Sequence, residues 1–238
     1  MWTASLLAAT QQGDLALVQQ IMRQSNNETA GAAARMKIAA RGATALHIAA
    51  QNGHLAVVEW LVKHGGADVA AVSKTGGTAL HTAARMGRLA VVEWLVKHGG
   101  ADVAVAAGNG STALHIVALQ GHLAVVEWLV KHGGADVSCL DANGFTALDM
   151  MCHLQRSHVL EGVQLLAQHL ALRSPPLAAR VCERLPAQCR EAAVSAVASS
   201  YKDVTERFAA YVQGEEDRAR EVQYLCVQAA AALRRLGR

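Results

Sequence analysis

One fifteen-residue segment, LAVVEWLVKHGGADV, occurs three times in this chain of 238 residues without a single change. The copies span residues 55–69, 89–103 and 123–137, and each follows the motif TALH by the same interval. The leucines of the three TALH motifs and of the related TALD at 146–149 recur every 34 residues, at Leu46, Leu80, Leu114 and Leu148. A fixed period of this size indicates one supersecondary unit stacked on copies of itself, because one unit alone is too small to bury its apolar face. A repeat array of this kind indicates a binding function more than a catalytic one.

The unit over residues 76–109 predicts two short helices and an extended arm. Thr78 suits the N-cap of a first helix over 79–86, and Gly87 ends that helix in a left-handed conformation. A second helix over 89–97 places Leu89, Val92, Leu95 and Val96 on one buried face. The glycines after this helix end it, and residues 101–110 form an arm with a turn at Gly108 and Asn109.

These features resemble an ankyrin repeat: TALH, a glycine between two helices, and GADV. The resemblance covers residues 42–170 closely and extends weakly to 6–22, so that it spans about residues 3–170. It implies an all-α solenoid of helix-turn-helix units with β-hairpin loops, followed by a C-terminal helical segment. The doubled glycine after each second helix makes the period 34 residues instead of the family's 33, and we expect the loop to absorb the extra residue.

The pattern divides the chain into three parts. Residues 1–40 are a capping repeat and linker, and 41–172 hold the repeats, of which the last is degenerate because Asp149 replaces the histidine of TALH. Residues 173–238 form the C-terminal segment, with helices near 177–185, 187–212 and 215–236, set off by a break at Pro175 and Pro176. The last two helices either fold back as a cap on the array or form an exposed partner or dimerisation element.

Composition narrows the function classes. The net charge of +3 is modest and its basic residues are scattered, so nucleic-acid binding is not indicated. No charge-free run of about 18 apolar residues is present, so no membrane span is expected, and the N-terminus lacks the basic region of a signal peptide. Five cysteines without CxxC spacing favour a reduced, intracellular chain, placed in the cytoplasm with the nucleus as the alternative.

Two histidine series repeat with the units: His47, His81 and His115, and then His64, His98 and His132. Copies one repeat apart lie about 10 Å from each other by analogy with the family, too far to share a metal ion. The family's TALH histidines form local hydrogen bonds, and we expect the same here. No nucleophile elbow, phosphate-binding loop or carboxylate pair supports catalysis, so neither an enzyme nor a cofactor is expected.

The tryptophans Trp60, Trp94 and Trp128 stand where the family usually has leucine. They form either an exposed aromatic stripe for a partner or part of the packing between repeats. Apolar neighbours in the same helices favour packing.

Differences between near-identical repeats point to the binding surface, although drift after duplication is the alternative explanation. By resemblance, the variable positions line the concave side of the array. The candidate partner-binding residues are Gln51, Asn52, Val72, Lys74, Thr75, Arg85, Met86, Asn109, Leu119, Gln120, Asn143 and Phe145. Arginine, methionine and phenylalanine are enriched at interfaces. The predicted function is a non-catalytic module or scaffold that binds another protein. The alternatives are an adaptor whose C-terminal helices recruit an effector, and a self-associating module. A homodimer through those helices is not favoured.

Overall fold

The computed structural model describes residues 2–24, 42–152, 159–211 and 231. It divides into two compact units, Met1–Ala135 and Asp136–Arg238, and each unit is described by itself.

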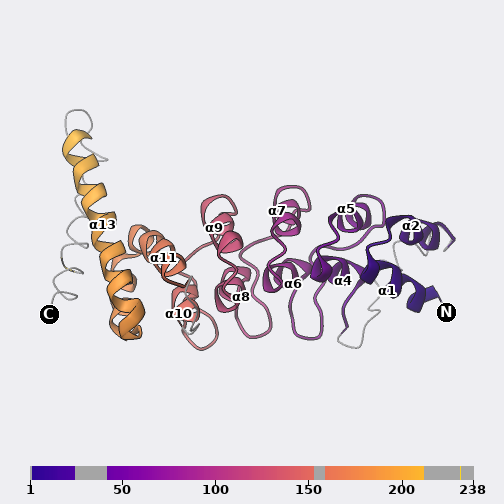
Figure 1. The fold of residues 1–238 in the computed structure, drawn as a ribbon, viewed down its shortest axis with the longest axis horizontal. Helices are drawn as coiled ribbons and strands as arrows, with labels where there is room; N and C mark the ends of the chain where they lie inside the picture. Colours follow the sequence, from indigo (N-terminus) through magenta and orange to yellow (C-terminus); the bar gives the residue numbers. More distant parts are fainter. Residues whose placement is uncertain (1, 25–41, 153–158, 212–230, 232–238) are drawn as a thin grey trace. The chain divides into compact units, whose positions relative to one another are not determined.

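The first unit consists of helix pairs that repeat along the chain. The first helices of the pairs are α1 (Trp2–Gln12), α4 (Ala45–Asn52), α6 (Ala79–Arg85) and α8 (Ala113–Gln120). The second helices are α2 (Leu15–Gln24), α5 (Leu55–Lys63), α7 (Leu89–Lys97) and α9 (Leu123–Lys131). Neighbouring pairs pack first helix on first helix and second on second, which gives two helical layers (Figure 1). The repeat architecture expected from the 34-residue period is confirmed.

A threonine and a histidine start each first helix of the repeats. Thr78 and His81 form a capping box. The threonine side chain accepts the backbone N–H of His81, and the His81 Nδ1 accepts the backbone N–H of Thr78 at 3.2 Å. The same box joins Thr44 to His47 and Thr112 to His115. These helices are then thin and buried, because alanines fill the positions where the neighbouring helix comes close.

The doubled glycines lie outside the helices, as expected. In the first repeat, α5 ends at Lys63, and the N–H groups of Gly65 and Ala67 bond back to the carbonyls of Trp60 and Leu61 at 3.0 and 2.9 Å. A Cβ on Gly65 would lie 2.8 Å from the Leu61 carbonyl oxygen, so the first glycine of the pair lets the backbone pass close to the helix end. The loop absorbs the extra residue.

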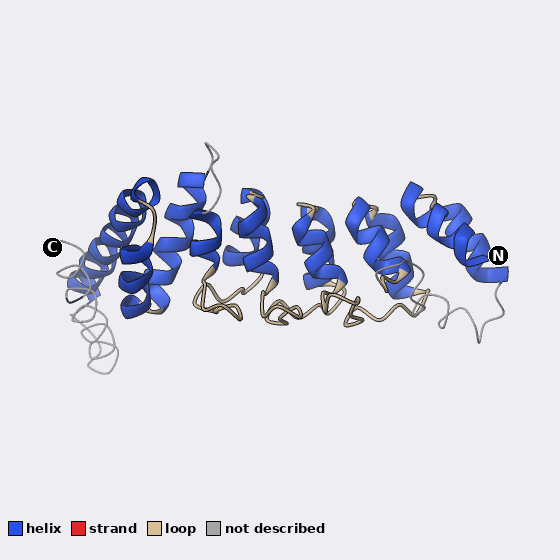
Figure 2. Ribbon diagram, turned by 90° about the horizontal axis from the view of Figure 1, so that it is seen from below, coloured by secondary structure: helices blue, strands red, loops and turns tan. Residues whose placement is uncertain are grey.

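The long loops between pairs fold back on themselves and run along one edge of the helices (Figure 2). The loop tip at 73–77 is closed by hydrogen bonds from Ser73 N to Gly77 O and from Gly76 N to Ser73 O, both 3.0 Å. The predicted hairpins are therefore present as closed turns, but no β-strand forms among the described residues. A single Gly108 N–Thr75 O bond of 3.2 Å joins two neighbouring tips, and one bond is too few for a ladder.

The core of the first unit is a column of equivalent side chains from successive repeats. Leu46, Leu80 and Leu114 of the first helices are at most 1% exposed, and so are Leu61, Leu95 and Leu129 of the second helices. Each repeat thus contributes the same apolar side chains to a continuous interior, as stacking of incomplete units requires.

The second unit contains α10 (Ala147–Cys152), α11 (Val159–Arg173), α12 (Pro175–Arg184) and α13 (Ala187–Tyr211). Helix α10 packs on α11, and α11 in turn packs along α13 and against α12. The helices predicted near 177–185 and 187–212 are present, but the first of them begins earlier. Pro175 and Pro176 occupy the opening positions of α12, where the backbone N–H has no partner within the helix and its absence costs nothing. The proline pair therefore begins α12 as well as following the end of α11. Apart from residue 231, the helix predicted near 215–236 lies outside the described residues.

Asp149 gives the fifth pair a different start from the others. Its Oδ2 accepts the Thr146 N–H at 2.8 Å and the Thr146 hydroxyl at 2.6 Å, so the carboxylate closes a capping box as histidine does elsewhere. Arg184 of α12 then donates to both carboxylate oxygens, at 2.9 and 2.6 Å. Helices α12 and α13 pack on α11 of the fifth pair. The capping alternative concerns the helices near 187–212 and 215–236, and it stays a prediction because nearly all of the second helix lies outside the described residues.

Candidate functional site

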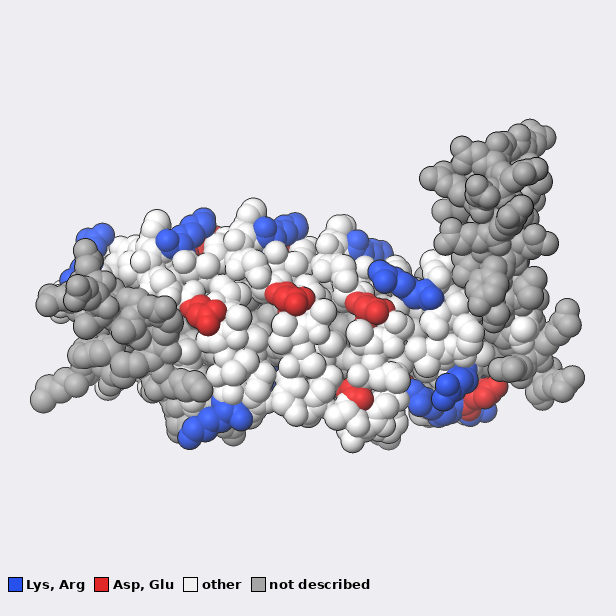
Figure 3. Space-filling model, turned by 180° about the vertical axis from the view of Figure 1, so that it is seen from behind, with Lys and Arg blue, Asp and Glu red and all other residues white. Residues whose placement is uncertain are grey.

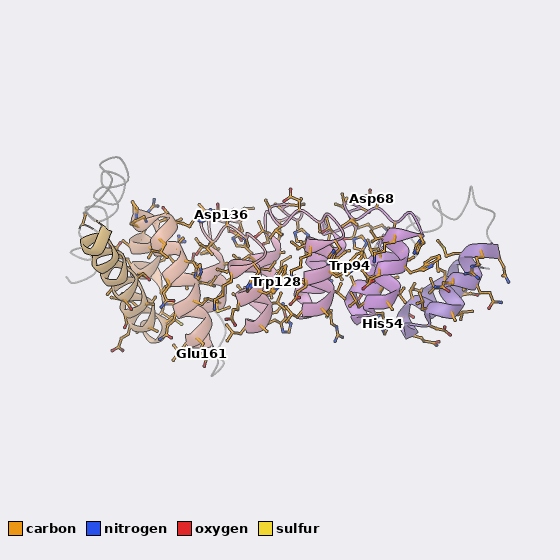
Figure 4. All side chains as sticks on the ribbon, turned by 90° about the horizontal axis from the view of Figure 1, so that it is seen from above. His54, Asp68, Trp94, Trp128, Asp136 and Glu161 are labelled. Atoms are coloured by element: carbon orange, nitrogen blue, oxygen red, sulfur yellow. The ribbon has the colours of Figure 1, made fainter. Side chains whose placement is uncertain are left out.

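The first unit has two edges that differ in chemistry. Viewed from above, Asp68 lies at the edge that carries the long loops, while His54 lies at the opposite edge, where each first helix turns into its second (Figure 4). The predicted binding residues of this unit divide between the two edges. The sequence analysis grouped these residues as one surface. In the structure they lie at two edges that are one first-helix length apart.

The hairpin edge holds four of the predicted residues, Val72, Lys74, Thr75 and Asn109, and all four are exposed. In this unit the tips touch through their backbones: a Cβ on Gly76 would lie 2.5 Å from the Gly108 nitrogen, and glycine at both positions permits this approach. Each arm begins with an aspartate turn, in which Asp68 Oδ1 accepts the Ala70 N–H at 2.9 Å. The aspartate of GADV therefore has a structural role.

The second unit contributes one tip, with Asn143 and Phe145 exposed. Asp141, which is buried, accepts the backbone N–H groups of both residues, at 2.9 and 2.8 Å. The Arg184 guanidinium lies 5.9 Å from the centre of the Phe145 ring. Phe145 thus stands at a fixed position beside a cation.

The opposite edge is the turn ridge, which we define as residues 11–14, 51–54, 85–88 and 119–122. It holds the other predicted residues of the first unit: Gln51, Asn52, Arg85, Met86, Leu119 and Gln120. Asn52 and Gln120 are half-buried and the rest are exposed, with Met86 at 37% and Leu119 at 42%.

Side chains tie each turn of the ridge to the one before it. The His54 Nε2 lies 2.9 Å from the Gln11 carbonyl oxygen, Arg88 Nε donates to Gln51 O at 3.1 Å, and His122 Nε2 lies 3.1 Å from Arg85 O. These bonds occupy carbonyls at the C-terminal ends of the first helices, which lack partners within the helix. The ridge is consequently a continuous row of turns.

A glycine with positive φ lies beneath each of these ties. Gly87 has φ of +66°, and a Cβ there would lie 2.7 Å from the His122 ring nitrogen. Gly53 also has a positive φ, and a Cβ there would lie 2.9 Å from the Cδ of Arg88. Glycine therefore serves both the left-handed turn and the close approach of the next repeat.

The histidines of TALH connect neighbouring repeats, as expected from the family. The Nε2 of His47 lies 3.0 Å from Gly77 O, and the Nε2 of His81 lies 3.0 Å from Val105 O. A backbone N–H can only donate and a carbonyl can only accept, so the proton is on Nε2 and the ring is neutral. Burial lowers the pKa of His81. In the described residues, no group of three or more His, Cys, Asp or Glu side chains could hold a metal ion.

Two of the three tryptophans are packing residues, as predicted. Trp94 and Trp128 are both 8% exposed, and Trp60, in the first repeat of the row, is half-buried. Lys63 lies 5.5 Å from the Trp94 ring centre and Lys97 lies 5.4 Å from that of Trp128. Each lysine therefore covers the tryptophan of the next repeat, which removes most of the ring from water.

The buried cysteines Cys152 and Cys182 do not provide a reactive nucleophile. Cys152, Cys182 and Cys189 are free thiols. Burial raises the pKa of Cys182 to about 11, and burial together with a hydrogen bond to Cys189 raises the pKa of Cys152. Thiols with such pKa values stay protonated at neutral pH, whereas the thiolate is the nucleophilic form.

Charges on the hairpin side of the repeats are mixed. Seen from behind, basic and acidic side chains are interspersed without a broad patch of one sign (Figure 3). The lysines near the ends of the second helices pair within their own helices, as Lys63 does with Glu59 at 3.4 Å and Lys131 with Glu127 at 2.6 Å. Solvated pairs of this kind contribute little stability.

The family model for ankyrin repeats (3 copies) matches residues 6–107 and 104–173. The chain is an ankyrin repeat protein. Ankyrin repeats are generally protein–protein interaction modules and are typically non-catalytic. A search of the curated proteins found no match. Among the described helices of this ankyrin repeat protein, none is both long enough and apolar enough to cross a membrane.

Sequence reasoning missed the ridge ties. His54, Arg88 and His122 recur every 34 residues, as the TALH histidines do, so the period itself could have revealed them. Arginine replaces histidine in the middle repeat and hides the series. The Asp149–Arg184 pair had no such signal, because nothing periodic relates the two residues.

Proposed function

We propose that this ankyrin repeat protein is a non-catalytic module that binds another protein through the side chains that differ between its repeats. The observation that carries the proposal is the contrast between a buried, repeated scaffold and unlike, exposed residues at its edges. The first helices are buried over most of their length and the second helices are nearly identical in sequence, so neither distinguishes one repeat from the next. The exposed residues that differ between repeats lie at the loop tips and the helix ends.

Preorganisation supports a binding role. The tips are closed by their own hydrogen bonds, and the ridge turns are tied to each other by His54, Arg88 and His122. A partner that docks on such residues loses little free energy in ordering them. The mechanism we propose is recognition by a surface that is already in its bound form.

Engagement of the titratable side chains in the scaffold supports a non-catalytic role. His47 and His81 use both ring nitrogens in hydrogen bonds to the backbone, and the buried thiols stay protonated. The free cysteines also support a location in the reducing interior of the cell, in the cytoplasm or the nucleus.

The test is affinity purification from the native cells with quantitative mass spectrometry. The bait is the full chain, compared with Arg85→Ala/Met86→Ala and with the matched control Glu59→Gln/Glu93→Gln on the second helices. We expect a partner that the wild type and the control retain equally and the surface variant loses. Absence of any protein enriched over empty beads contradicts the binding role, and equal recovery by all three baits contradicts the surface.

The alternative is an adaptor whose repeats select a target while the C-terminal helices recruit an effector. Packing of α12 and α13 on α11 favours a cap for the described part of that segment. Deletion of residues 174–238 separates the two roles and is treated in the Discussion.

A further inference from the structure

We propose that the turn ridge binds an acidic segment of the partner protein that carries at least one large apolar side chain, with Arg85, Met86, Arg88 and Leu119 as the principal contacts. This inference rests on the proposed function and names both the edge and the chemistry of its partner.

The first argument is charge. The ridge holds two arginines, Arg85 and Arg88, and one acidic residue, Asp14. Asp14 is already engaged, because its Oδ1 accepts the Leu17 N–H at 2.9 Å at the start of α2. The first turns of α5, α7 and α9, which begin at this edge, contain no acidic residue. The edge therefore has positive charge and no compensating carboxylate beside the arginines.

The second argument is that the two arginines are unpaired. The ion pairs formed by described residues are Lys63–Glu59, Lys97–Glu93, Lys131–Glu127 and Arg184–Asp149, and neither Arg85 nor Arg88 is among them. Arg88 is exposed and uses Nε to hold the Gln51 carbonyl. A held guanidinium is well suited to a carboxylate, since its planar donors match two oxygens at once.

The third argument is the apolar surface between the charges. Met86 lies in the turn between Arg85 and Arg88, and Leu119 lies in the next turn, which the His122–Arg85 bond joins to the first. Both side chains are exposed, at 37% and 42%. Met and Arg are enriched at interface cores, and cations alone would suit phosphate as well. The apolar pair favours a peptide over a nucleic-acid backbone.

The hairpin edge differs in its charge balance. It also exposes a cation and an apolar side chain, Lys74 and Val72, but an aspartate opens each arm and the lysines at the ends of the second helices are paired with glutamates of the same helix. A ridge of three turns about 10 Å apart matches an extended segment of about six residues at 3.3 Å per residue. The expected ligand is therefore a short extended stretch.

The chain supplies its own control variant. The turn of the preceding repeat reads AQNGHLA where this one reads ARMGRLA, and the sequences that follow are identical. Arg85→Gln/Met86→Asn/Arg88→His consequently installs a turn that already folds one repeat away, with histidine making the same tie as His54 does. The charge and apolar contributions separate into Arg85→Gln/Arg88→His and Met86→Asn. A comparison variant at the other edge, Val72→Ala/Lys74→Gly/Thr75→Asn, installs the residues of the following hairpin tip.

The experiment selects twelve-residue peptides from a random phage library on the immobilised full chain. Fluorescence anisotropy then measures the most enriched peptide against each variant, with a twelve-nucleotide single-stranded DNA as a second probe. We expect enriched peptides rich in Asp and Glu around a large apolar residue, and binding at least ten-fold weaker for the triple ridge variant. The second-helix control Glu59→Gln/Glu93→Gln should bind within two-fold of wild type, and the hairpin variant should lose less affinity than the triple ridge variant. Affinity should fall with salt less steeply for Arg85→Gln/Arg88→His.

Three outcomes overturn the inference. Enriched peptides that are not acidic, or that lose affinity only for the hairpin variant, place the partner elsewhere and leave the proposed function intact. Binding of the DNA that depends on Arg85 and Arg88 assigns the ridge to nucleic acid. If the ridge variant recovers the native partner as well as wild type does, the ridge is refuted as the binding site but the proposed function stands. If neither the peptide selection nor the native purification yields a binder, the proposed function itself is contradicted.

Discussion

At the scale of single residues, the hydrogen bonds of the TALH histidine require its neutral form. His81 accepts a backbone N–H on Nδ1 and donates from Nε2 to the Val105 carbonyl, and only the neutral ring can do both. Its main-chain partners belong to two different repeats, so one imidazole joins the start of a helix to the loop of its neighbour. Protonation of Nδ1 would oppose the Thr78 N–H.

We therefore predict that acid destabilises the first unit. Burial lowers the pKa of His81 below its ordinary value of 6.5, so the unfolded chain takes up the proton first as the pH falls. The stability from this group is complete above about pH 6.5 and decreases below it, by at most about 1.4 kcal/mol per pH unit. Urea unfolding at pH 7.5 and 5.5 measures the change. His81→Gln keeps a capping box without a titrating ring, and an equal pH slope in that variant would contradict the prediction.

A second residue-scale prediction concerns Gly87. Alanine there adopts an unfavourable positive φ, which costs about 1–2 kcal/mol, and its Cβ meets the His122 ring. Gly100 also has positive φ but nothing within 4 Å of its Cβ, so Gly100→Ala isolates the backbone cost. Thermal unfolding should show the larger loss for Gly87→Ala, and His122→Ala in the same chain should remove part of the difference. Equal losses for the two alanines would disprove the steric contribution.

At the scale of elements, the second helices pack through a repeated aromatic contact. Trp94 contacts His98 of its own helix end, at 6.2 Å between ring centres, and is covered by Lys63 of the preceding repeat. The same contacts recur at Trp128, so the contact is a property of the repeat. It holds adjacent second helices together at the hairpin end.

Trp94→Ala should accordingly destabilise the unit by about 3–5 kcal/mol, the usual cost of truncating a buried tryptophan. Chemical denaturation measures the loss, and Trp60→Ala, at the half-buried copy, is the comparison and should cost less. A melting curve that does not move while partner binding disappears would instead identify the tryptophans as an exposed binding stripe.

Removal of Arg184 should loosen α12. Asp149 is 5% exposed and would remain buried without its cation, so we expect Arg184→Ala to cost about 1–3 kcal/mol. Hydrogen exchange of the α12 amides should become faster. Arg180→Ala, an exposed arginine on the same helix, is the control and should leave exchange unchanged. Equal exchange in both variants would show that the ion pair does not hold the helix.

The sequence was sufficient for elements that repeat and insufficient for those that do not. Helix 89–97 was predicted to the residue, because its apolar spacing and flanking glycines leave no alternative. The start of α12 was misplaced because a proline pair signals both an end and a beginning. Most of the candidate binding residues are exposed, which follows from their variability, but their division between two edges depends on which end of a first helix each occupies.

At the scale of the whole chain, the C-terminal segment decides between two roles. Deletion of residues 174–238 removes α12 and α13, which pack on α11. We expect the truncated chain to melt at a lower temperature and to aggregate, since α11 then exposes apolar surface. Light scattering and thermal unfolding measure both. A stable, folded product that loses one binding partner would favour the adaptor, and one that loses a dimer would favour self-association.

The ties between repeats also limit how such a gene can change in length. His47 and His81 reach forward to the next loop, while His54, Arg88 and His122 reach back to the previous turn. Insertion of one whole 34-residue unit preserves every one of these bonds, whereas an insertion of any other size within a unit shifts donors away from their carbonyls. The array can therefore grow or shrink by complete copies at little cost, and each new copy brings another turn whose side chains can diverge.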